Sequence, residues 1–253
     1  MPPPSIAVIP ARLASQRLPR KPLALLGGEP LIVRVCEAAA SAGVFDRVVV
    51  AADSAEVVNA VERAGYTAVL TDPALPSGTD RVAAAAQLMA VPSEAVIVNV
   101  QGDEPFVDAT CLRALVDRVR TLPTAVATPV VPITDVGVLA DPNAVKVAVG
   151  TDGRALYFSR ASIPYSRDAP GRLSPKLHWR HLGLYAYTHA SLARIAAYPP
   201  HPLEQLERLE QLRWLAHGEH VACVAVGEAH RGIDTPADLA LANELFAKRA
   251  ATP

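Results

Sequence analysis

The stretch IAVIPARLASQRLPRKPL, residues 6–23, begins with an apolar run of strand-forming residues that ends at a proline. A loop follows at once, and its side chains include four cations and a serine: Arg12, Ser15, Arg17, Arg20 and Lys21. Ligands of α/β proteins bind at loops that follow the carboxyl ends of strands. Several fixed cations near backbone N–H groups suit a polyphosphate. By itself, this segment also allows the interpretation of a solvated basic loop with no ligand.

The composition predicts a globular protein with a large core. The chain has 253 residues, of which 51% are hydrophobic, enough to bury a core without disulfides or structural metals. The net charge of −1 at pH 7 argues against a sequence-independent surface for nucleic acid. Cys36, Cys111 and Cys223 are odd in number and lack metal-ligand spacing, so we expect buried, reduced thiols.

The amino terminus, MPPPS, lacks the charged and apolar regions of a signal peptide. No apolar run approaches the roughly 18 residues that a membrane-spanning helix needs. These two observations predict a cytoplasmic protein that does not insert into a membrane.

The first half of the chain alternates between apolar, β-rich runs and helical patterns. We expect strands at 6–9, 48–52 and 96–100, and helices at 31–42, 56–64 and 109–119. Because the strands are apolar throughout rather than at alternate positions, both faces of the sheet are expected to be covered, which is typical of parallel strands. This alternation predicts a doubly wound, mainly parallel α/β sheet. Asp53 and Glu56 predict a capping box at the start of the second helix.

The second half has a different pattern, with short strands separated by Pro, Gly and Asp. We expect these strands at 125–131, 145–149, 155–158 and 184–188, with no helix before Ser191, as an antiparallel extension of the main sheet. An amphipathic helix is expected at 203–217, a core strand at 221–226, and a last helix that starts at Thr235-Pro236. We expect a single domain, 1–253, in which 125–200 form an inserted lobe. By analogy, that lobe is expected to form the surface of a homodimer.

Two carboxylates stand where parallel strands and helices meet. Asp103 follows the apolar strand 96–100, and Asp234 precedes the last helix. Mg²⁺ takes one or two protein carboxylates and completes its shell with water and phosphate oxygens, so this pair suits one magnesium ion. A turn at Gly102-Asp103 and a helix cap at Asp234 are the alternative interpretations. Neither G-x-x-x-x-G-K-[ST] nor G-x-G-x-x-G follows the first strand, which counts against P-loop NTPases and nicotinamide dehydrogenases.

Other polar segments are weaker candidates for a site. Ser77 and Gly78 open a helix that runs to Met89, where small residues allow a base or phosphate to approach the backbone. Arg160 could bind a carboxylate through two N–H groups. His181 and Tyr185, four residues apart on one expected strand, would face the same side. Ordinary caps and buried aromatic residues remain the alternative for all of them.

Taken together and in order, these segments resemble the 3-deoxy-manno-octulosonate cytidylyltransferases, also called CMP-Kdo synthetases. The resemblance runs from Ile6 to about Asn243, in VIPARLASQRLPRKPL, SGTDR, VNVQGDEP, NAVKV, ALYFSRASIP, RHLGLYAY, PLEQLERLEQLR and GIDTPADL. The segments RHLGLY, FSR and LEQLR are the more specific ones. The first loop differs from that of the related CMP-sialate synthetases. Arg20 and Ala52 depart from the family pattern, in which glycine and threonine are common.

The resemblance implies a reaction in which the anomeric hydroxyl of Kdo attacks the α-phosphate of CTP, giving CMP-Kdo and pyrophosphate for lipopolysaccharide synthesis. It implies catalytic roles for Arg12, Lys21, Asp103 and Asp234, with the two aspartates as ligands of Mg²⁺. It implies a nucleotide site made of Ala11, Arg12, Ser15, Arg17, Lys21, Ala52, Asp53, Ser77 and Gly78. It implies a sugar site made of Gln101, Arg160, His181, Tyr185, Glu210 and Gln211, with Arg160 as the partner of the Kdo carboxylate.

Three alternatives remain open. A sugar-1-phosphate nucleotidyltransferase that uses UTP or GTP would share the basic loop and Asp103, but would not require RHLGLY and LEQLR. A CMP-sialate-type synthetase would differ in the first loop. A nucleotide-sensing module without catalysis would keep the fold and the loop but would have no use for two carboxylates on one metal.

Overall fold

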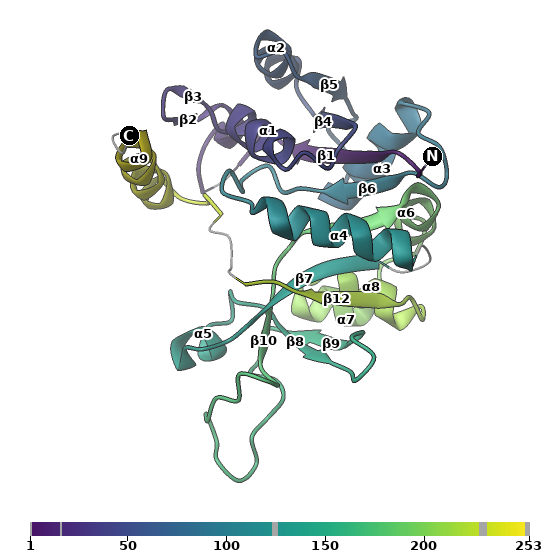
Figure 1. Ribbon diagram of the computed structural model, residues 1–253, viewed down its shortest axis with the longest axis vertical. Coiled ribbons are helices and arrows are strands. Elements are labelled where there is room, and N and C mark those ends of the chain that lie inside the picture. Colours follow the sequence, from purple (N-terminus) through teal and green to yellow (C-terminus); the bar gives the residue numbers. More distant parts are fainter. Residues whose placement is uncertain (1, 16, 123–125, 228–231, 251–253) are drawn as a thin grey trace. The chain divides into compact units, whose positions relative to one another are not determined.

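The computed structural model describes residues 2–15, 17–122, 126–227 and 232–250 (Figure 1). Residues 248–250 are described without their side chains. The chain forms two compact units. The first unit comprises Met1–Arg113 and His230–Pro253, and the second comprises Ala114–Ala229. The expectation of a single domain with an inserted lobe at 125–200 stays a prediction.

The first unit contains a parallel sheet. Its strands lie in the order β5-β4-β1-β6, with the bounds Thr67–Leu70 for β5, Arg47–Ala52 for β4, Ser5–Ala11 for β1 and Val96–Asn99 for β6. Each neighbouring pair is parallel, and the three predicted strands are confirmed. Strand β5 was not predicted, because its residues are only half-buried or exposed and form no long apolar run. Ala7, Val8 and Ile9 of β1 are completely buried, as expected for a strand that is covered on both faces.

Three helices connect these strands: α1 (Leu31–Ser41), α2 (Ala55–Arg63) and α3 (Gly78–Leu88). Helix α4 (Ala109–Thr121) follows β6 and runs into the second unit, and α9 (Pro236–Ala250) follows the second unit. Right-handed crossovers place α1 and α2 on one face of the β5-β4-β1-β6 sheet and α3 on the other, which is the doubly wound arrangement. The predicted capping box at Asp53 is wrong. Ser54 caps α2 and accepts a hydrogen bond from Glu56 N, since one more residue is needed to turn the chain out of β4.

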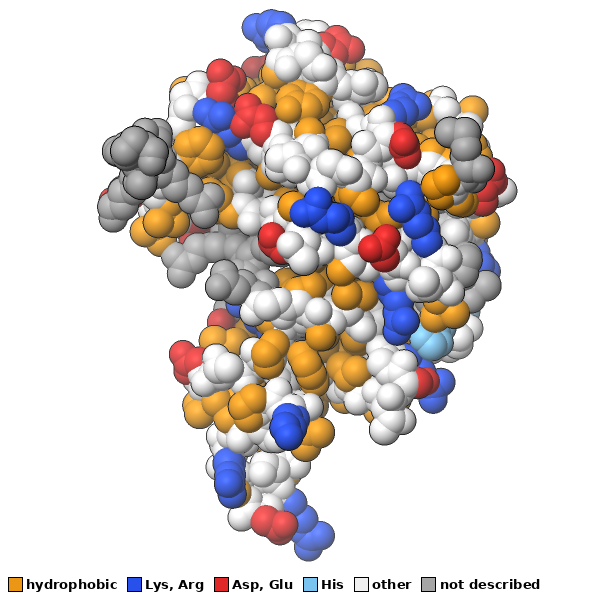
Figure 2. Space-filling model, viewed as in Figure 1, with side chains coloured by type: hydrophobic (Ala, Val, Ile, Leu, Met, Phe, Trp, Pro, Cys, Tyr) orange, Lys and Arg blue, Asp and Glu red, His pale blue; other side chains and the backbone are white. Residues whose placement is uncertain are grey.

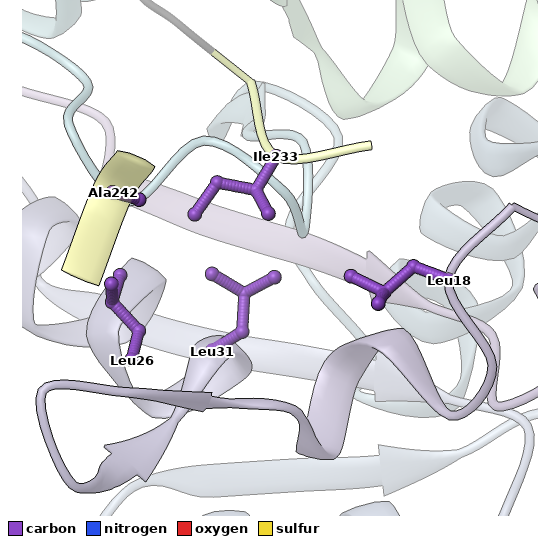
Figure 3. Close-up of a cluster of buried hydrophobic side chains, with 5 residues drawn as sticks. All are labelled: Leu18, Leu26, Leu31, Ile233 and Ala242. Atoms are coloured by element: carbon purple, nitrogen blue, oxygen red, sulfur yellow. The ribbon is translucent and has the colours of Figure 1, made fainter. Parts of the chain in front are cut away.

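A short hairpin and the last helix build an apolar cluster against α1. The hairpin strands β2 (Leu25–Leu26) and β3 (Glu29–Pro30) follow the short helix η1 (Lys21–Leu23), and turn through Gly27 and Gly28, both at positive φ. Figure 3 shows the buried cluster itself, which consists of Leu18, Leu26, Leu31, Ile233 and Ala242. These side chains come from the basic loop, the hairpin, α1 and the carboxyl-terminal segment. The cluster therefore holds together parts of the first unit that are more than 200 residues apart in sequence.

The second unit is built around β7 (Val126–Pro132). Strands β10 (Trp179–His181) and β11 (Tyr185–Thr188) pair with it antiparallel, and β12 (Val221–Ala225) pairs with it parallel. Strands β8 (Lys146–Val149) and β9 (Ala155–Ser159) continue the antiparallel part beyond β10. This is the antiparallel extension expected for the second half. Residue 125 of the first predicted strand lies outside the described residues.

Three expectations for the second unit need correction. A short helix, α5 (Val136–Ala140), precedes Ser191, and α6 (His189–Ala196) begins two residues before it. His181 and Tyr185 lie on different strands. The irregular segment 182–184 separates β10 from β11. Thr128 Oγ1 holds this segment by donating to the carbonyl oxygens of Leu182 and Leu184.

The predicted helix 203–217 is wrong, because the structure has two short helices, α7 (Pro202–Glu207) and α8 (Gln211–Ala216). Arg208 between them adopts the left-handed conformation with φ 55°, which ends α7. Leu206 on α7 is 82% exposed, whereas Leu212 on α8 is completely buried. The leucine spacing continues through the break, which is why the sequence pattern resembles one helix.

The structure bears on two expectations from composition. All three cysteines are free; Cys36 and Cys111 are buried and Cys223 is partly exposed. Burial raises the pKa of each thiol to about 12, so these thiols stay protonated and unreactive at neutral pH. Among the described residues, no helix is both long and apolar enough to cross a bilayer. On the face shown in Figure 2, acidic and basic side chains are interspersed.

The apolar cluster yields a stability prediction. Ile233 is 1% exposed, so Ile233→Ala leaves a cavity beside Leu31 and should lower the free energy of unfolding by about 2–5 kcal/mol. The matched control is Leu206→Ala at an 82% exposed site, which should change it by less than about 0.5 kcal/mol. Urea denaturation measures both. Equal effects in the two variants would show that Ile233 does not pack as described.

Candidate active site

The basic loop after β1 borders a cavity of about 300 Å³ at the carboxyl edge of the first unit's sheet. That volume is at the small end of ligand pockets. The residues that line it are Pro10, Ala11, Arg12, Ala14, Ser15, Arg17, Lys21, Pro22, Gly78, Gln101, Gly102, Asp103 and Asp234. The cavity therefore joins the loop after β1 to the segment after β6, the start of α3 and the residue before α9. Gln16 lies outside the described residues.

Lys21 binds both carboxylates that the sequence singled out. Its Nζ lies 2.5 Å from Oδ2 of Asp103 and 2.9 Å from Oδ1 of Asp234. Arg17 Nη2 lies 2.9 Å from the same oxygen of Asp234. The Lys21 side chain is only 14% exposed, so its ion pairs are less screened than surface pairs. Asp103 and Asp234 thus meet in space, although 131 positions separate them in sequence.

The backbone holds the two carboxylates in place. Ile233 N donates to the Asp103 carbonyl oxygen at 2.9 Å, which ties the segment before α9 to the segment after β6. Thr235 and Asp238 cap α9 reciprocally: Asp238 N donates to Thr235 Oγ1, and Thr235 N donates to Asp238 Oδ2. A Cβ atom at Gly102 would lie 2.7 Å from the Pro10 carbonyl oxygen, so only glycine fits where the ends of β6 and β1 meet.

These side chains suit a divalent cation in the chemistry of their donors. Two carboxylates reach one point, and among the described residues no third His, Cys, Asp or Glu joins them. A set of one or two carboxylates is what Mg²⁺ uses when phosphate oxygens and water complete its shell. Asp103 and Asp234 would hold the ion, which would neutralise negative charge on a bound ligand.

Of the predicted nucleotide residues, Ala52, Asp53 and Ser77 do not line this cavity but lie in segments beside it. Asp53 Oδ1 accepts a hydrogen bond from Leu13 N at 2.9 Å, so this carboxylate fixes the start of the basic loop. Arg12 Nη2 donates to the Leu75 carbonyl oxygen at 2.5 Å, across to the loop that follows β5. Ala11 and Ala52, both buried, are paired at the ends of β1 and β4.

Ser77 and Gly78 begin α3 as predicted. Ser77 Oγ accepts a hydrogen bond from Asp80 N and donates to Asp80 Oδ2, which forms the cap. Gly78 lines the cavity, and a Cβ atom there would touch the Pro10 ring at 3.6 Å. Arg20, by contrast, pairs with Glu56 and does not line the cavity, so it is separate from the cations that do.

The predicted sugar residues fall into two groups. Gln101 lines the cavity in the first unit. The remaining five, Arg160, His181, Tyr185, Glu210 and Gln211, belong to the second unit. Their role in binding a sugar stays a prediction.

Arg160 follows β9 and is held by many contacts. Its Nε donates to the Glu207 carbonyl oxygen at 2.7 Å, and its Nη1 donates to the Pro142 carbonyl oxygen at 2.9 Å. Lys146 Nζ, in turn, donates to the Arg160 carbonyl oxygen at 2.5 Å. A contact of this guanidinium with a substrate carboxylate therefore requires it to exchange carbonyl partners.

His181 and Tyr185 are neighbours despite their separate strands, with ring centroids 5.5 Å apart. His181 Nε2 lies 2.9 Å from Thr128 Oγ1. Burial, and next the charge of Arg180, lower the pKa of His181 to about 3, so the ring is neutral at pH 7. Burial raises the pKa of Tyr185 well above its usual value, and the ring packs edge-on against Trp214. Beside them Gln211 is 3% exposed, and Glu210 lies 3.7 Å from Arg213.

Comparison with known proteins identifies the chain. Residues 6–221 match the model of a family described as cytidylyltransferase. The 3-deoxy-manno-octulosonate cytidylyltransferase of Gemmatimonas aurantiaca is 49% identical over 242 residues, which are 95% of this chain and 93% of that protein. The chain belongs to the cytidylyltransferase family.

A solved structure is similar to this cytidylyltransferase over almost its entire length. It is the structure of CMP:2-keto-3-deoxy-manno-octonic acid synthetase complexed with CTP, with a TM-score of 0.88 and 36% identity, covering 97% of this chain and 99% of the other. The similarity confirms the predicted Rossmann-like nucleotidyltransferase fold. It also confirms the resemblance that the sequence segments indicated.

Sequence reasoning missed several residues of the cytidylyltransferase. Ala14, Pro22 and Gly102 line the cavity, and only Gly102 has a signal, as a glycine directly after a buried strand. Lys146 and Glu207 hold the Arg160 backbone; Glu207 Oε2 accepts from Arg160 N at 3.0 Å. A lysine inside the apolar run of β8 was the signal for Lys146, because buried lysines require partners.

The buried histidine predicts a pH dependence of stability. Its pKa is about 3 in the folded protein and 6.5 in the unfolded chain, so the unfolded chain binds one more proton between these values. Stability from this group is therefore fully present above pH 6.5 and is lost as the pH falls toward 3. His181→Gln should flatten the loss of stability between pH 6 and 5 by about 1.4 kcal/mol per pH unit, measured by urea denaturation. Parallel curves for the two proteins would contradict this assignment.

Proposed function

We propose that this cytidylyltransferase transfers the cytidylyl group of CTP to the anomeric hydroxyl of Kdo, releasing CMP-Kdo and pyrophosphate. The observation that carries the proposal is the meeting of Lys21, Asp103 and Asp234 in the cavity beside the basic loop. Phosphoryl transfer needs positioning and neutralisation of charge more than a covalent nucleophile, and this cavity offers both. The relative from Gemmatimonas aurantiaca and the CTP-bound structure support CTP as the nucleotide and Kdo as the acceptor.

The cationic, acidic and neutral residues of the site would have different roles. Lys21, Arg12 and Arg17 would bind the triphosphate and stabilise the charge that grows on the leaving pyrophosphate. Mg²⁺ held by Asp103 and Asp234 would neutralise phosphate oxygens and lower the pKa of the attacking hydroxyl. Ser15 would bind phosphate, and Ala11, Ala52, Asp53, Ser77 and Gly78 would surround the cytidine. Gln101 would bind the sugar, and Arg160 its carboxylate.

We further propose that the protein is a homodimer in the cytoplasm and that its reaction is one step of lipopolysaccharide synthesis. The chemistry of the product supports this position in a biosynthetic sequence, because an activated sugar acid is consumed next by a glycosyltransferase. Residues 125–200 are proposed as the dimer surface, and sedimentation of the purified protein tests the oligomeric state.

The direct test is incubation of the purified protein with CTP, Mg²⁺ and Kdo, with release of pyrophosphate as the readout. Activity that requires all three supports the proposal. Turnover with a sugar-1-phosphate and UTP or GTP instead would favour the sugar-1-phosphate nucleotidyltransferase, and nucleotide binding without turnover would favour a sensing module. A sialic acid and the amino-substituted analogue of Kdo are the further acceptors to compare.

Lys21→Ala should reduce kcat/KM about 100- to 1000-fold, because it removes a preorganised cation at the phosphates. The matched control is Arg20→Ala, since this neighbouring cation pairs with Glu56 and does not line the cavity. The control should retain activity within about threefold. Both variants should keep the circular dichroism spectrum of the parent. Near-parental turnover of Lys21→Ala would refute the role of Lys21 at the leaving group.

Asp103→Asn and Asp234→Asn test whether the two carboxylates act on one ion. Each change alone should lower kcat by about 100-fold or more, and the double change should cost much less than the product of the two effects. Calorimetric titration with Mg²⁺ in the presence of CTP should show the same lost binding event in all three variants. Two independent, multiplicative effects would contradict a shared ion.

A further inference from the structure

Glu207, the last residue of α7, is a carboxylate of the second unit to which the proposed chemistry gives no role. Its Oε2 accepts a hydrogen bond from Arg160 N at 3.0 Å, and its Oε1 accepts one from Ser159 Oγ at 2.6 Å. The carboxylate therefore holds the chain at the end of β9 and does not bind the neighbouring guanidinium. A carboxylate beside an arginine can accept two parallel N–H groups from its side chain, so this choice of partners calls for a physical explanation.

The guanidinium of Arg160 is left with uncharged partners. Its Nε and Nη1 donate to the carbonyl oxygens of Glu207 and Pro142, and its Nη2 donates to the Arg208 carbonyl oxygen at 3.4 Å. Among the described residues, none of these hydrogen bonds goes to a carboxylate. A guanidinium in a protein stays charged, and an ion pair with a carboxylate is stronger than a hydrogen bond to a neutral carbonyl oxygen. An incoming carboxylate can therefore displace a carbonyl oxygen from this side chain.

The backbone of Arg160 is held on both sides by charged groups. Its N–H donates to the Glu207 carboxylate, and its carbonyl oxygen accepts from Lys146 Nζ. Lys146 is completely buried, and its Nζ also donates to the Asp141 carbonyl oxygen at 2.8 Å. Neither of the two contacts to the Arg160 backbone involves the guanidinium. The backbone can therefore stay in place while the side chain exchanges partners.

Apolar packing does not explain where Glu207 lies. None of the six residues of α7, all of which the structure describes, is buried. Polar contacts attach this helix instead: Glu204 forms two hydrogen bonds with Arg213 of α8, and Glu207 binds the end of β9. Leu209, which is 6% exposed, is the first buried residue after the helix. The position of the Glu207 carboxylate is thus set by its hydrogen bonds and not by the core.

We propose that Glu207 is a positioning residue for a sugar-acid acceptor. Together with Lys146, it fixes the backbone of Arg160 while the guanidinium releases a carbonyl oxygen and binds the acceptor carboxylate. This inference rests on the proposed function, in which Arg160 binds the carboxylate of Kdo. A backbone that is already ordered does not lose further conformational freedom when the acceptor binds. The contribution of Glu207 therefore falls on binding of the acid acceptor and not on binding of CTP.

Steady-state kinetics of Glu207→Ala test this role, because the change removes both acceptor oxygens. The KM for Kdo should rise about 10- to 100-fold, the value of one hydrogen bond to a charged group, and the KM for CTP should stay within about threefold. Glu207→Gln should restore most of the loss, since its amide oxygen can accept from Arg160 N while the Ser159 hydroxyl turns to accept from its amide N–H.

The matched control is Glu219→Gln, which alters a carboxylate that pairs with Arg194 elsewhere in the second unit and has an 8% exposed side chain. The control should lower stability and keep the parental ratio of the two KM values. An unchanged KM for Kdo in Glu207→Ala, or an equal rise in both KM values, would overturn the inference.

A double-mutant cycle shows whether Glu207 acts through Arg160. Arg160→Met alone should raise the KM for Kdo at least as much as Glu207→Ala does. Adding Glu207→Ala to Arg160→Met should change this KM by less than about threefold, because the side chain to be positioned is already absent. Multiplicative effects would show that Glu207 acts independently of Arg160 and would overturn the inference.

A measurement on the unaltered protein applies if a variant does not fold. In ¹⁵N-labelled protein, Kdo added with CTP but without Mg²⁺ should shift the Nε–H resonance of Arg160, while its backbone N–H stays protected from exchange in D₂O. An unmoved Nε–H resonance or an unprotected backbone N–H would overturn the inference. The proposed function can fail separately. Turnover of CTP and Kdo with no effect of Glu207→Ala removes only the role of Glu207, whereas an absence of turnover with Kdo removes both.

Discussion

The ion pairs of Lys21 with Asp103 and Asp234 are the interaction on which the rest of the site depends. One largely buried ammonium group satisfies two carboxylates that would otherwise repel each other at close range. The same three groups are what a metal-dependent phosphoryl transfer requires, so the resting ion pairs and the proposed chemistry use one set of charges. A divalent cation held by Asp103 and Asp234, as proposed, would neutralise the same two carboxylates. The arrangement thus keeps the site assembled when no substrate is bound.

Apolar packing places these charges with little freedom. Leu18 anchors the basic loop three residues before Lys21, and Ile233 anchors the chain directly before Asp234, both within one buried cluster (Figure 3). The hydrogen bond from Ile233 N to the Asp103 carbonyl oxygen adds the third segment. Each charged residue is therefore a near neighbour in sequence of a buried or hydrogen-bonded group. Packing of this kind is how a loop gains the positional precision that catalysis needs.

The parts of the structure that could be predicted are those that depend on local sequence. The strands β1, β4 and β6 were predicted because each is apolar over its length, and β5 was missed because Thr67–Leu70 is not. The meeting of Asp103 and Asp234 followed from their places at strand and helix ends. That Lys21 joins them did not, since ion pairing depends on side-chain directions. The break at Arg208 was likewise hidden, because a left-handed residue leaves no mark on the spacing of leucines. His181 and Tyr185 were expected to face the same side of one strand, but the irregular segment that puts them on two strands was not expected.

The first unit is discontinuous along the chain, since its last segment begins at His230, after the whole second unit. During synthesis, Lys21 and Asp103 therefore leave the ribosome long before Asp234 exists to join them. A nascent chain that has completed only 1–229 lacks one of the two carboxylates, along with Ile233 and α9. If Asp234 has the proposed role, catalytic competence would arrive only with the last tenth of translation, and a protein shortened at its carboxyl terminus would be inert although it carried every other residue of the site.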